Sequence, residues 1–371
     1  MRILLDYRPA LRERTGVGEY VHELARAVVA SAAPHESLTL FSSSWKDRIS
    51  PDAVPGAHVL DRRYPVSLLN FTWHRLGLPR VDRMTDAPFD VVHSAHPLLV
   101  PSAHAAQVIT VHDLDFLDHP ERTRREIRRD YPVLAASHAQ RADHIVAVSE
   151  HTADDVMRRF GVTRSKITVA HPGTPGWTPR EREPDAGTTL FLGTLEPRKN
   201  LGVLLDAYER LLSRLKSVPP LVLAGRATPD ADELVRRAQR PPLAGHVRLV
   251  GYVQPDRRPE IYRDALVLVM PSHTEGFGIP AAEAMAFGVP VIAANRGALP
   301  ETVGTAGRLF DPTNADALAD ALAAVLGDAD LRREMREAGF EQARQFQWTA
   351  TAARVRQAWS RALDHKKARR G

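Results

Sequence analysis

The fold is decided by the stretch LVLVMPSHTEGFGIPAAEAMAFGVPVIAA, residues 266–294. Its two ends, 266–271 and 290–294, are short apolar runs that would be buried on both faces, which is typical of parallel strands covered by helices. Glycines and a proline between them indicate a loop that leads into a helix start. The stretch therefore predicts a strand–loop–helix–strand unit, the repeating element of doubly wound α/β sheets.

The same alternation runs along the whole chain. Amphipathic patterns such as 20–30, 201–215 and 317–326 separate short runs rich in Val, Ile and Leu, and two further helical patterns cover 331–346 and 349–364. The apolar runs predict six strands in the first half, at 3–6, 38–42, 90–94, 108–113, 144–149 and 167–171, and six in the second, at 189–193, 221–225, 247–253, 266–271, 290–294 and 308–310.

A boundary between two domains is visible near residue 175. Residues 172–179 are rich in turn-forming Pro and Gly, and residues 180–187 are charged without a periodic apolar face. Each side of this segment begins again with a strand, so we predict Rossmann-like domains at 1–175 and 176–348. No strand follows the last helical pattern, so residues 349–371 need not belong to the second sheet.

Composition excludes several classes of protein. With 371 residues, 43% hydrophobic and 26% charged, the chain is typical of a soluble globular protein. The absence of Cys excludes a disulfide scaffold, a thiolate metal site and a catalytic thiol. No apolar run is long enough to span a bilayer and no signal-peptide pattern is present, so we expect a cytoplasmic protein.

The net charge of +5 is modest, but basic residues cluster. Residues 121–129 hold five Arg against two Glu, and residues 365–370 hold two Lys and two Arg. Such clusters suit an anionic partner such as membrane headgroups, a phosphate-bearing substrate or nucleic acid. A solvated helix face with a frayed tail remains the alternative.

Two candidate ligand loops lie in the first domain, because doubly wound sheets bind ligands at the carboxyl ends of their strands. Gly16 and Gly18 open a helix after the first strand, where backbone N–H groups and the helix N-terminus can meet an anion. His112 follows another strand and would point to the same edge. The Asp113/Asp115 pair resembles a metal-binding D-x-D, but no further ligand completes an oxygen-rich site, so no metal is predicted. A tight turn and a hydrogen-bonded cap remain the alternatives.

Two more loops lie in the second domain. Arg198 and Lys199 follow the strand at 189–193 and form a candidate diphosphate receptor, with Asn200 expected to cap the next helix. Glu275 and Glu283 are separated by a Gly-Phe-Gly loop and a helix start, where carboxylates can accept hydrogen bonds from vicinal hydroxyls of a sugar or ribose. We expect Glu283 to face solvent, so that its replacement by alanine leaves the fold intact.

Together these motifs resemble the retaining, metal-independent glycosyltransferases of family 4, which have the GT-B fold of two Rossmann-like domains facing a central cleft. The E-x7-E element of residues 275–283 is that family's signature, and the resemblance extends over residues 16–18, 111–113, 147–150, 193–200 and 247–253. The segment Gly-Thr-Leu-Glu-Pro-Arg-Lys-Asn at 193–200 is most similar to mannosyltransferase-type enzymes of bacterial surface polysaccharide assembly.

The resemblance implies roles for individual residues. Lys199 would bind phosphate, Glu275 the donor sugar and Glu283 the ribose, while His112 would lie beside the transferred sugar. Thr194 stands where many members carry Arg, and Arg198 is the candidate to replace that charge. The remaining donor contacts would come from backbone groups, at Gly16 and Gly18 for the diphosphate, at Phe277, Gly278 and Ile279 for the sugar, and at Tyr252 and Val253 for the base.

The function expected from this resemblance is retaining transfer of a hexose, mannose or similar, from a nucleotide sugar such as GDP-mannose or a UDP-sugar. The acceptor would be a lipid-linked or other saccharide in lipopolysaccharide or related synthesis, with no cofactor, metal or nucleic acid involved. Residues 349–371 would pack back on the first domain. Arg125, Arg128 and Arg129 would share a helix face that contacts an anionic membrane peripherally. A nucleotide-sugar 2-epimerase and a non-catalytic sugar-nucleotide-binding protein are the alternatives.

Overall fold

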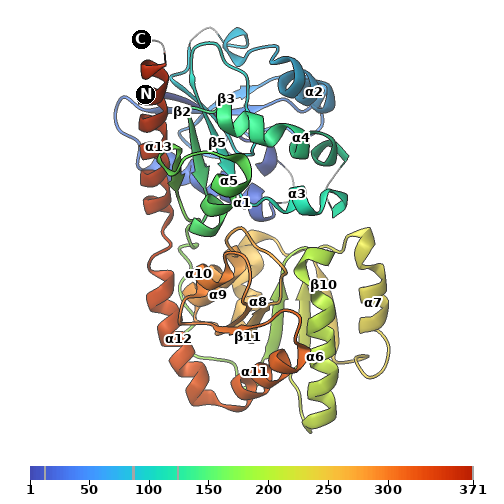
Figure 1. Ribbon diagram of the computed structural model, residues 1–371. Coiled ribbons are helices and arrows are strands. Elements are labelled where there is room, and N and C mark those ends of the chain that lie inside the picture. The colour runs from blue at the N-terminus through green and yellow to red at the C-terminus, as the bar shows by residue number, and fades with distance from the viewer. Residues whose placement is uncertain (12–13, 86–87, 123–124, 370–371) are drawn as a thin grey trace. The chain divides into compact units, whose positions relative to one another are not determined.

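The chain forms two parallel sheets, each in its own structural unit (Figure 1). The computed structural model describes residues 1–371 except 12–13, 86–87, 123–124 and 370–371. Unit 1 comprises Met1–Gly173 with Gln347–Gly371, and unit 2 comprises Thr174–Phe346. The sequence analysis placed the corresponding boundaries at 175 and 349, two residues away from each of these.

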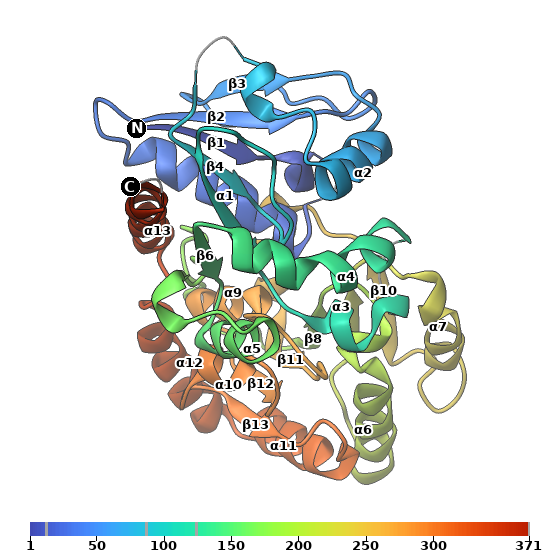
Figure 2. The same cartoon turned by 45° about the horizontal axis from the view of Figure 1, so that its top comes forward.

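Unit 1 contains a seven-stranded sheet in the order β3-β2-β1-β4-β5-β6-β7, with every neighbouring pair parallel. Figure 2 shows β3, β2, β1 and β4 in this order. The strands are β1 (Arg2–Asp6), β2 (Ser37–Ser42), β3 (His58–Asp61), β4 (Val91–Ser94), β5 (Ala106–Val111), β6 (His144–Ala147) and β7 (Ile167–Val169). The edge strand β3 was not predicted, because its residues are at most half-buried and it has no apolar run.

Helices connect most of these strands, while long loops lead from β2 to β3 and from β4 to β5, because parallel strands need a crossover connection. The helices of unit 1 are α1 (Gly16–Ala30), α2 (Val66–Leu76), α3 (Asp115–Asp118), α4 (Arg125–Arg141), α5 (Glu150–Phe160) and α13 (Trp348–Ala368), with short 3-10 turns η1 (Arg8–Ala10), η2 (Val81–Arg83), η3 (Pro120–Arg122) and η4 (Arg164–Lys166). Of these helices, α13 follows unit 2 in the chain. The start of α5 is fixed by Ser149, whose side chain accepts a hydrogen bond from the N–H of Thr152, and Gly161 ends it in the left-handed conformation.

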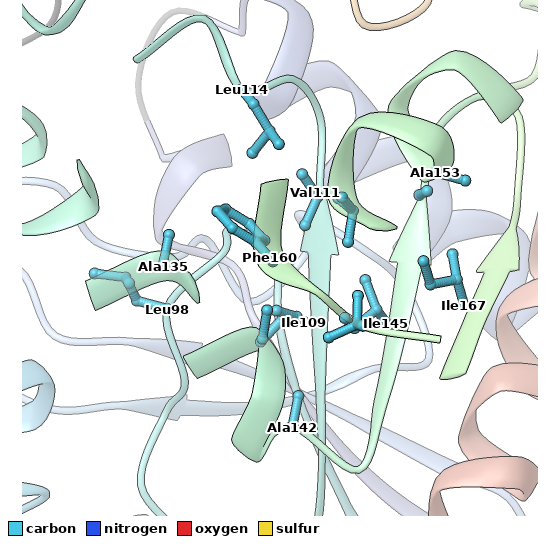
Figure 3. Close-up of a cluster of buried hydrophobic side chains, with 14 of the residues drawn as sticks. Leu98, Ile109, Val111, Leu114, Ala135, Ala142, Ile145, Ala153, Phe160 and Ile167 are labelled. Atoms are coloured by element: carbon cyan, nitrogen blue, oxygen red, sulfur yellow. The ribbon is translucent and has the colours of Figure 1, made fainter. Parts of the chain in front are cut away.

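One core of unit 1 lies between β5–β7 and the helices α4 and α5 (Figure 3). Ile109 and Val111 of β5 and Ile145 of β6 meet Ala153 and Phe160 of α5, and all five side chains are buried. Apolar burial of this kind is the main source of folding free energy and holds the carboxyl end of β5, where His112 follows, in a fixed place.

The C-terminal helix α13 packs within unit 1, against α1 and β4–β7, although α12 before it belongs to unit 2. Its Trp359 is fully buried, and Nε1 donates to Nδ1 of His93 at 3.1 Å. Because indole can only donate, His93 must carry its proton on Nε2, which lies 2.8 Å from the hydroxyl of Thr110. Burial lowers the pKa of His93 to about 3, so the ring is neutral.

Unit 2 contains a six-stranded parallel sheet in the order β10-β9-β8-β11-β12-β13. All six strands were predicted from their apolar runs; they are β8 (Thr188–Leu192), β9 (Leu221–Ala224), β10 (Val247–Gly251), β11 (Ala265–Met270), β12 (Val291–Ala294) and β13 (Arg308–Phe310). The predicted fold class, two Rossmann-like parallel sheets, is thus confirmed.

The helices of unit 2 follow the same alternation until the chain leaves the sheet. They are α6 (Leu201–Arg214), α7 (Asp232–Ala238), α8 (Arg258–Arg263), α9 (Ile279–Phe287), α10 (Leu299–Val303), α11 (Ala315–Gly327) and α12 (Ala329–Ala343), with 3-10 turns η5 (Pro197–Lys199), η6 (Pro229–Ala231) and η7 (Pro255–Arg257). Among the helices described in either unit, none combines the length and the hydropathy needed to span a bilayer.

We expect Trp359→Ala to destabilise unit 1 by about 3–5 kcal/mol, because it leaves a cavity beneath α13 and removes the donor to His93. Trp359→Phe should cost less, since the ring volume is largely kept. Chemical denaturation followed by circular dichroism measures both, with the exposed Trp45→Phe as the matched control. Equal stability of Trp359→Ala and the control would show that α13 contributes no core contact to unit 1.

Candidate functional site

Three loops of unit 2 meet at the carboxyl ends of β8, β9 and β10, and glycines make this possible. The N–H of Gly193 donates to the carbonyl of Ala224 at 2.9 Å, and that of Gly225 to the carbonyl of Gly251 at 2.7 Å. A Cβ on Gly225, which has φ +149°, would lie 1.8 Å from the carbonyl oxygen of Gly193. Only glycine fits there, so the loop that carries Thr194, Arg198 and Lys199 can approach the loop after β9.

Lys199 and Arg198 both contact the carboxylate of Glu275, which the sequence places 76 and 77 residues away. Nζ of Lys199 lies 2.6 Å from Oε1, and Nη1 of Arg198 lies 3.2 Å from Oε2. The hydroxyl of Ser272 donates to Oε1 at 2.6 Å. His112, Arg198, Lys199 and Glu275 are the predicted catalytic residues. The structure brings the last three of them together at the carboxyl ends of β8 and β11.

Charge keeps this buried carboxylate ionised. Glu275 is only 6% exposed, and burial alone would raise its pKa. The charges of Lys199 and Arg198 and the hydrogen bonds from Lys199 and Ser272 outweigh that effect and lower the pKa to about 2. Arg198 also pairs with Glu196 at 3.0 Å, so two cations face two carboxylates. An anion that binds here has to compete with these carboxylates for the cations.

The loop from Glu275 to Gly278 leads into the N-terminus of α9. Gly278 has φ +98°, and a Cβ on Gly297 would come within 2.7 Å of the backbone of Glu275. The loop is also tied down from its other side, because the N–H of Ala298 donates to the carbonyl of Glu275 at 3.0 Å and the hydroxyl of Thr302 donates to that of Phe277. Phe277 and Gly278 are buried and Ile279 is half-buried. These backbone contacts therefore hold the loop between Glu275 and the start of α9 in a fixed conformation.

Glu283 does not face solvent, contrary to the sequence expectation. It is 1% exposed, with Oε1 2.7 Å from Nη1 of Arg258 and Oε2 2.9 Å from the hydroxyl of Tyr262. Burial and the neighbouring Glu283 charge raise the pKa of Tyr262 well above its usual value. The expectation that Glu283 faces solvent is therefore wrong. In place of an intact fold we now expect Glu283→Ala to destabilise unit 2, because the change would leave Arg258 buried without its carboxylate.

Arg258 and Tyr262 were missed by the sequence analysis. Both belong to α8, which was not predicted, and nothing in their spacing marks them as partners of a glutamate 25 and 21 residues later. A single Arg in a charged segment reads as a solvated side chain, whereas here it is buried.

Asn200 does not cap α6 with its side chain, contrary to expectation, although it is the N-cap residue and has φ +51°. Its amide instead donates to the carbonyls of Pro271 at 3.1 Å and Pro312 at 2.8 Å. Asn200 thus ties the loop after β8 to the loops after β11 and β13. Tyr252 and Val253 follow β10 directly, and both are half-buried.

Gly16 and Gly18 of unit 1, which were predicted to bind an anion, differ in whether the packing around them leaves room for a side chain. Both lie in the first turn of α1, whose N-cap Thr15 makes no side-chain capping bond. A Cβ on Gly18 would lie 2.7 Å from the carbonyl oxygen of Pro9, whereas a Cβ on Gly16 would meet nothing within 4 Å. Packing against η1 therefore requires Gly18, and Gly16 leaves open space at the helix N-terminus.

His112 directly follows β5 and is half-buried. Its Nε2 lies 3.2 Å from the carbonyl oxygen of Ala95, and its ring meets that of Tyr20 edge-on at 4.9 Å between centroids. Burial lowers the pKa of His112 to about 4, although Asp113 acts in the opposite direction. The imidazole is therefore neutral near pH 7 and can offer hydrogen bonds but not a positive charge.

The aspartates after His112 are engaged locally. Oδ1 of Asp113 accepts the N–H of Asp115 at 3.2 Å, and Asp115 pairs with Arg122 at 3.7 Å. Over the described part of the chain, no group of three or more His, Asp or Glu side chains is arranged to hold a metal ion.

The two halves of the chain match two glycosyltransferase family models. Residues 179–342 match the family model "Glycosyl transferases group 1", and residues 14–176 match "Glycosyltransferase Family 4". The chain is 30% identical to the O-antigen chain mannosyltransferase B of Escherichia coli, over 94% of this chain and 96% of that protein. It is 29% identical to D-inositol 3-phosphate glycosyltransferase 2 of Catenulispora acidiphila, over 98% and 94% of the two chains.

A solved structure shares the fold. The sucrose-phosphate synthase of Thermosynechococcus elongatus superposes with a TM-score of 0.77 at 21% sequence identity, covering 96% of this chain and 97% of that one. The two-sheet architecture is thus of the GT-B type.

We expect Arg258→Gln to destabilise unit 2 by about 3–5 kcal/mol, because it leaves the buried Glu283 carboxylate without its counter-charge. The double change Arg258→Met with Glu283→Met should recover most of this loss, since both buried charges disappear. Urea denaturation measures the free energy of unfolding. The neighbouring Arg257 is 67% exposed, and Arg257→Gln serves as the matched control with no expected change. If Arg258→Gln behaved like that control, the buried ion pair would not stabilise unit 2.

Proposed function

Since this chain belongs to the glycosyltransferases of group 1 and family 4, we propose that it transfers a hexose from a nucleoside diphosphate sugar to a saccharide, with retention of configuration. The similarity to a mannosyltransferase of O-antigen chains favours mannose, donated by GDP-mannose, and a role in cell-surface polysaccharide synthesis. That the chain is a glycosyltransferase follows from the family; the donor, the stereochemistry and the polysaccharide are the proposal.

The observation that carries the proposal is the cluster of Lys199, Arg198 and Glu275. When the bond between sugar and diphosphate breaks, negative charge grows on the departing phosphate oxygens. Lys199 and Arg198 can stabilise that charge, and preorganised cations in a buried site are worth more than in water. In the absence of donor the two carboxylates Glu275 and Glu196 satisfy the cations, so donor binding exchanges carboxylate for phosphate contacts.

Glu275 is released to the sugar by this exchange. Once Lys199 turns to phosphate, the oxygens of Glu275 can accept hydrogen bonds from sugar hydroxyls, with the amides of Phe277, Gly278 and Ile279 beside it. Glu283 keeps lone pairs beyond those used by Arg258 and Tyr262, and these can accept the ribose hydroxyls. Because Glu283 is almost fully buried, this contact requires local movement of the chain around it.

The acid–base properties of the site favour transfer over 2-epimerisation. Epimerisation at C2 needs carboxyl groups that exchange protons near neutral pH. With a pKa of about 2, Glu275 is deprotonated near neutral pH and cannot act as an acid. With a pKa of about 4, His112 is neutral there and cannot act as an acid either. In retaining transfer the departing phosphate itself takes the proton of the acceptor hydroxyl, and a neutral His112 can offer a hydrogen bond without a positive charge.

Release of nucleoside diphosphate tests the function. The protein is incubated with GDP-, UDP-, ADP- and TDP-sugars, with and without mannose-containing oligosaccharides, in the presence and absence of EDTA. We expect one donor to be preferred, release to depend on the acceptor, and EDTA to have no effect, because Lys199 and Arg198 supply the positive charge. Formation of an epimer without acceptor, or loss of transfer to EDTA with recovery on adding Mg²⁺, would contradict the proposal.

Lys199→Ala should lower turnover more than donor affinity, because phosphate charge grows in the transition state. We expect a loss of about 100-fold or more in kcat and a smaller loss in affinity. Calorimetry with the nucleoside diphosphate measures affinity, and initial rates at saturating donor measure kcat. Lys216→Ala, at an exposed lysine of the same unit, is the control. Equal losses in both quantities would mean that Lys199 contributes binding only.

A lipid-linked acceptor would bring the enzyme to the inner face of the cell membrane, and we propose peripheral contact there. The sequence analysis assigned this contact to Arg125, Arg128 and Arg129. Of these, Arg128 donates to the carbonyls of Pro120 at 3.1 Å and Glu121 at 2.6 Å, and Arg129 pairs with Asp130 at 2.6 Å. The side chain of Arg125 lies outside what the structure describes. Intramolecular hydrogen bonds thus already engage two of the three guanidinium groups.

A further inference from the structure

Exposed apolar side chains concentrate in one segment of unit 1. Of the thirteen large hydrophobic residues exposed among the described residues, six lie within positions 64–78 and only three in unit 2. The six are Tyr64, Val66, Leu68, Phe71, Leu76 and Leu78. Leu68 is 58% exposed and Leu76 64%, which are large fractions for leucine. Single exposed apolar residues are ordinary on protein surfaces, but such a concentration within one short segment indicates a binding surface.

The segment is built around α2, whose two faces have different roles. The inward residues Leu69 and Trp73 are buried in a core cluster of unit 1, and Nε1 of Trp73 donates to the carbonyl of Pro79 at 2.8 Å. Leu68, Phe71 and Arg75 follow one another at spacings of three and four, so they share the outward face. The core is therefore complete without these outward side chains.

Helix α4 extends this surface. It packs beside α2, and the guanidinium carbon of Arg129 lies 5.7 Å from the centre of the Phe71 ring. Arg75 of α2 in turn lies 3.3 Å from Asp130 of α4. Val133, one turn after Arg129, is 66% exposed. We call the exposed apolar residues of positions 64–78 together with Val133 the α2 surface.

Arginines flank the α2 surface along the chain, and we call them its rim. Residues 61–83 contain five arginines against two aspartates, a net charge of +3, at positions 62, 63, 75, 80 and 83. The acidic groups nearby are engaged: Asp61 pairs with Arg48 at 2.7 Å, and Asp82 accepts from Ser102 and from the N–H of Ala103. Asp130 is held between Arg75 and Arg129. The rim is thus positive.

We propose that the α2 surface is the membrane-docking face of the protein and that its occupant is an anionic lipid bilayer. Leu68, Phe71 and Leu76 would insert at the boundary between headgroups and acyl chains, while the arginines contact headgroup phosphates. Arginine suits this position, since its aliphatic stem can lie along apolar groups with the guanidinium in the polar layer. The proposal deepens the peripheral contact proposed above and rests on it, but it does not depend on the transfer reaction.

Charge distinguishes a bilayer from a second copy of the chain. In a symmetric dimer the same patch meets itself, so the positive rim would face another positive rim. Like charges at that distance repel, whereas an anionic bilayer neutralises every arginine of the rim. The combination of apolar centre and positive edge therefore favours lipid.

Vesicle flotation of the full chain, without donor or acceptor, tests the proposal. We expect binding to vesicles of phosphatidylcholine with phosphatidylglycerol, and little binding to phosphatidylcholine alone. L68Q/F71Q/L76Q should lower binding at least about tenfold at low and at high salt, because the inserting side chains are lost. R63Q/R80Q/R83Q should lower it at least about tenfold at low salt and remove most of the salt dependence.

The matched control is L215Q/V250Q/L309Q, which replaces the three exposed apolar residues of unit 2 and should bind as the parent does. Circular dichroism checks that each variant is folded; if the apolar variant unfolds, R63Q/R80Q/R83Q decides alone. No binding to anionic vesicles, or binding unchanged in either variant, would overturn the proposal. So would a dimer in sedimentation without lipid that L68Q/F71Q/L76Q disperses, since the occupant would then be a second copy. Because no transfer is measured, failure here leaves the proposed reaction untouched.

Discussion

The donor side of this enzyme depends on a buried carboxylate held by two cations. Taking Glu275, Lys199 and Arg198 out of water costs free energy, which only close pairing and additional hydrogen bonds can offset. Ser272 supplies one such bond, and the backbone strengthens the arrangement, because the N–H of His273 donates to the carbonyl of Arg198 at 2.9 Å. The loops after β8 and β11 are thereby locked together before any ligand arrives. A phosphate of the proposed donor would meet two cations held close together, and it would have to compete with Glu275 for them.

This cluster could not form without a tight backbone around it. Gly225 lets the loop after β9 touch Gly193, and Gly297 lets the chain before α10 touch the backbone of Glu275. Asn200 completes the arrangement by bonding two carbonyls from different loops. A Cβ on Gly225 would lie 1.8 Å from the carbonyl oxygen of Gly193, and a Cβ on Gly297 2.7 Å from the backbone of Glu275, so a side chain at either position would push the loops apart. The glycines therefore act on chemistry indirectly, through the distance between Lys199 and Glu275.

Sequence patterns predicted what depends on local spacing and missed what depends on tertiary partners. Buried strands such as β8 and β11 have unbroken apolar runs, so the two sheets and the positions of Lys199, Glu275 and His112 at strand ends could be predicted. Edge strand β3 lacks such a run because one side of it has no neighbour. Glu283 was wrongly predicted to face solvent, because the partners that bury it come from α8. The α2 surface was not predicted, because only the fold shows which apolar residues lie outside the core.

The two units differ in the kind of electrostatics that they bring to the proposed transfer. Unit 2 supplies the charged groups Lys199, Arg198 and Glu275. In the proposed transfer, the two cations would stabilise the negative charge that grows on the leaving diphosphate. Unit 1 supplies His112, which burial keeps neutral. The carbonyl of Ala95 accepts a hydrogen bond from Nε2 and orients the ring. This bond and the Asp113 charge act to raise the pKa of His112, but burial outweighs them and keeps the ring neutral. Burial of a histidine in unit 1 and pairing of a glutamate in unit 2 thus have opposite results: burial keeps His112 neutral, whereas the charges of Lys199 and Arg198 keep Glu275 ionised although it is buried.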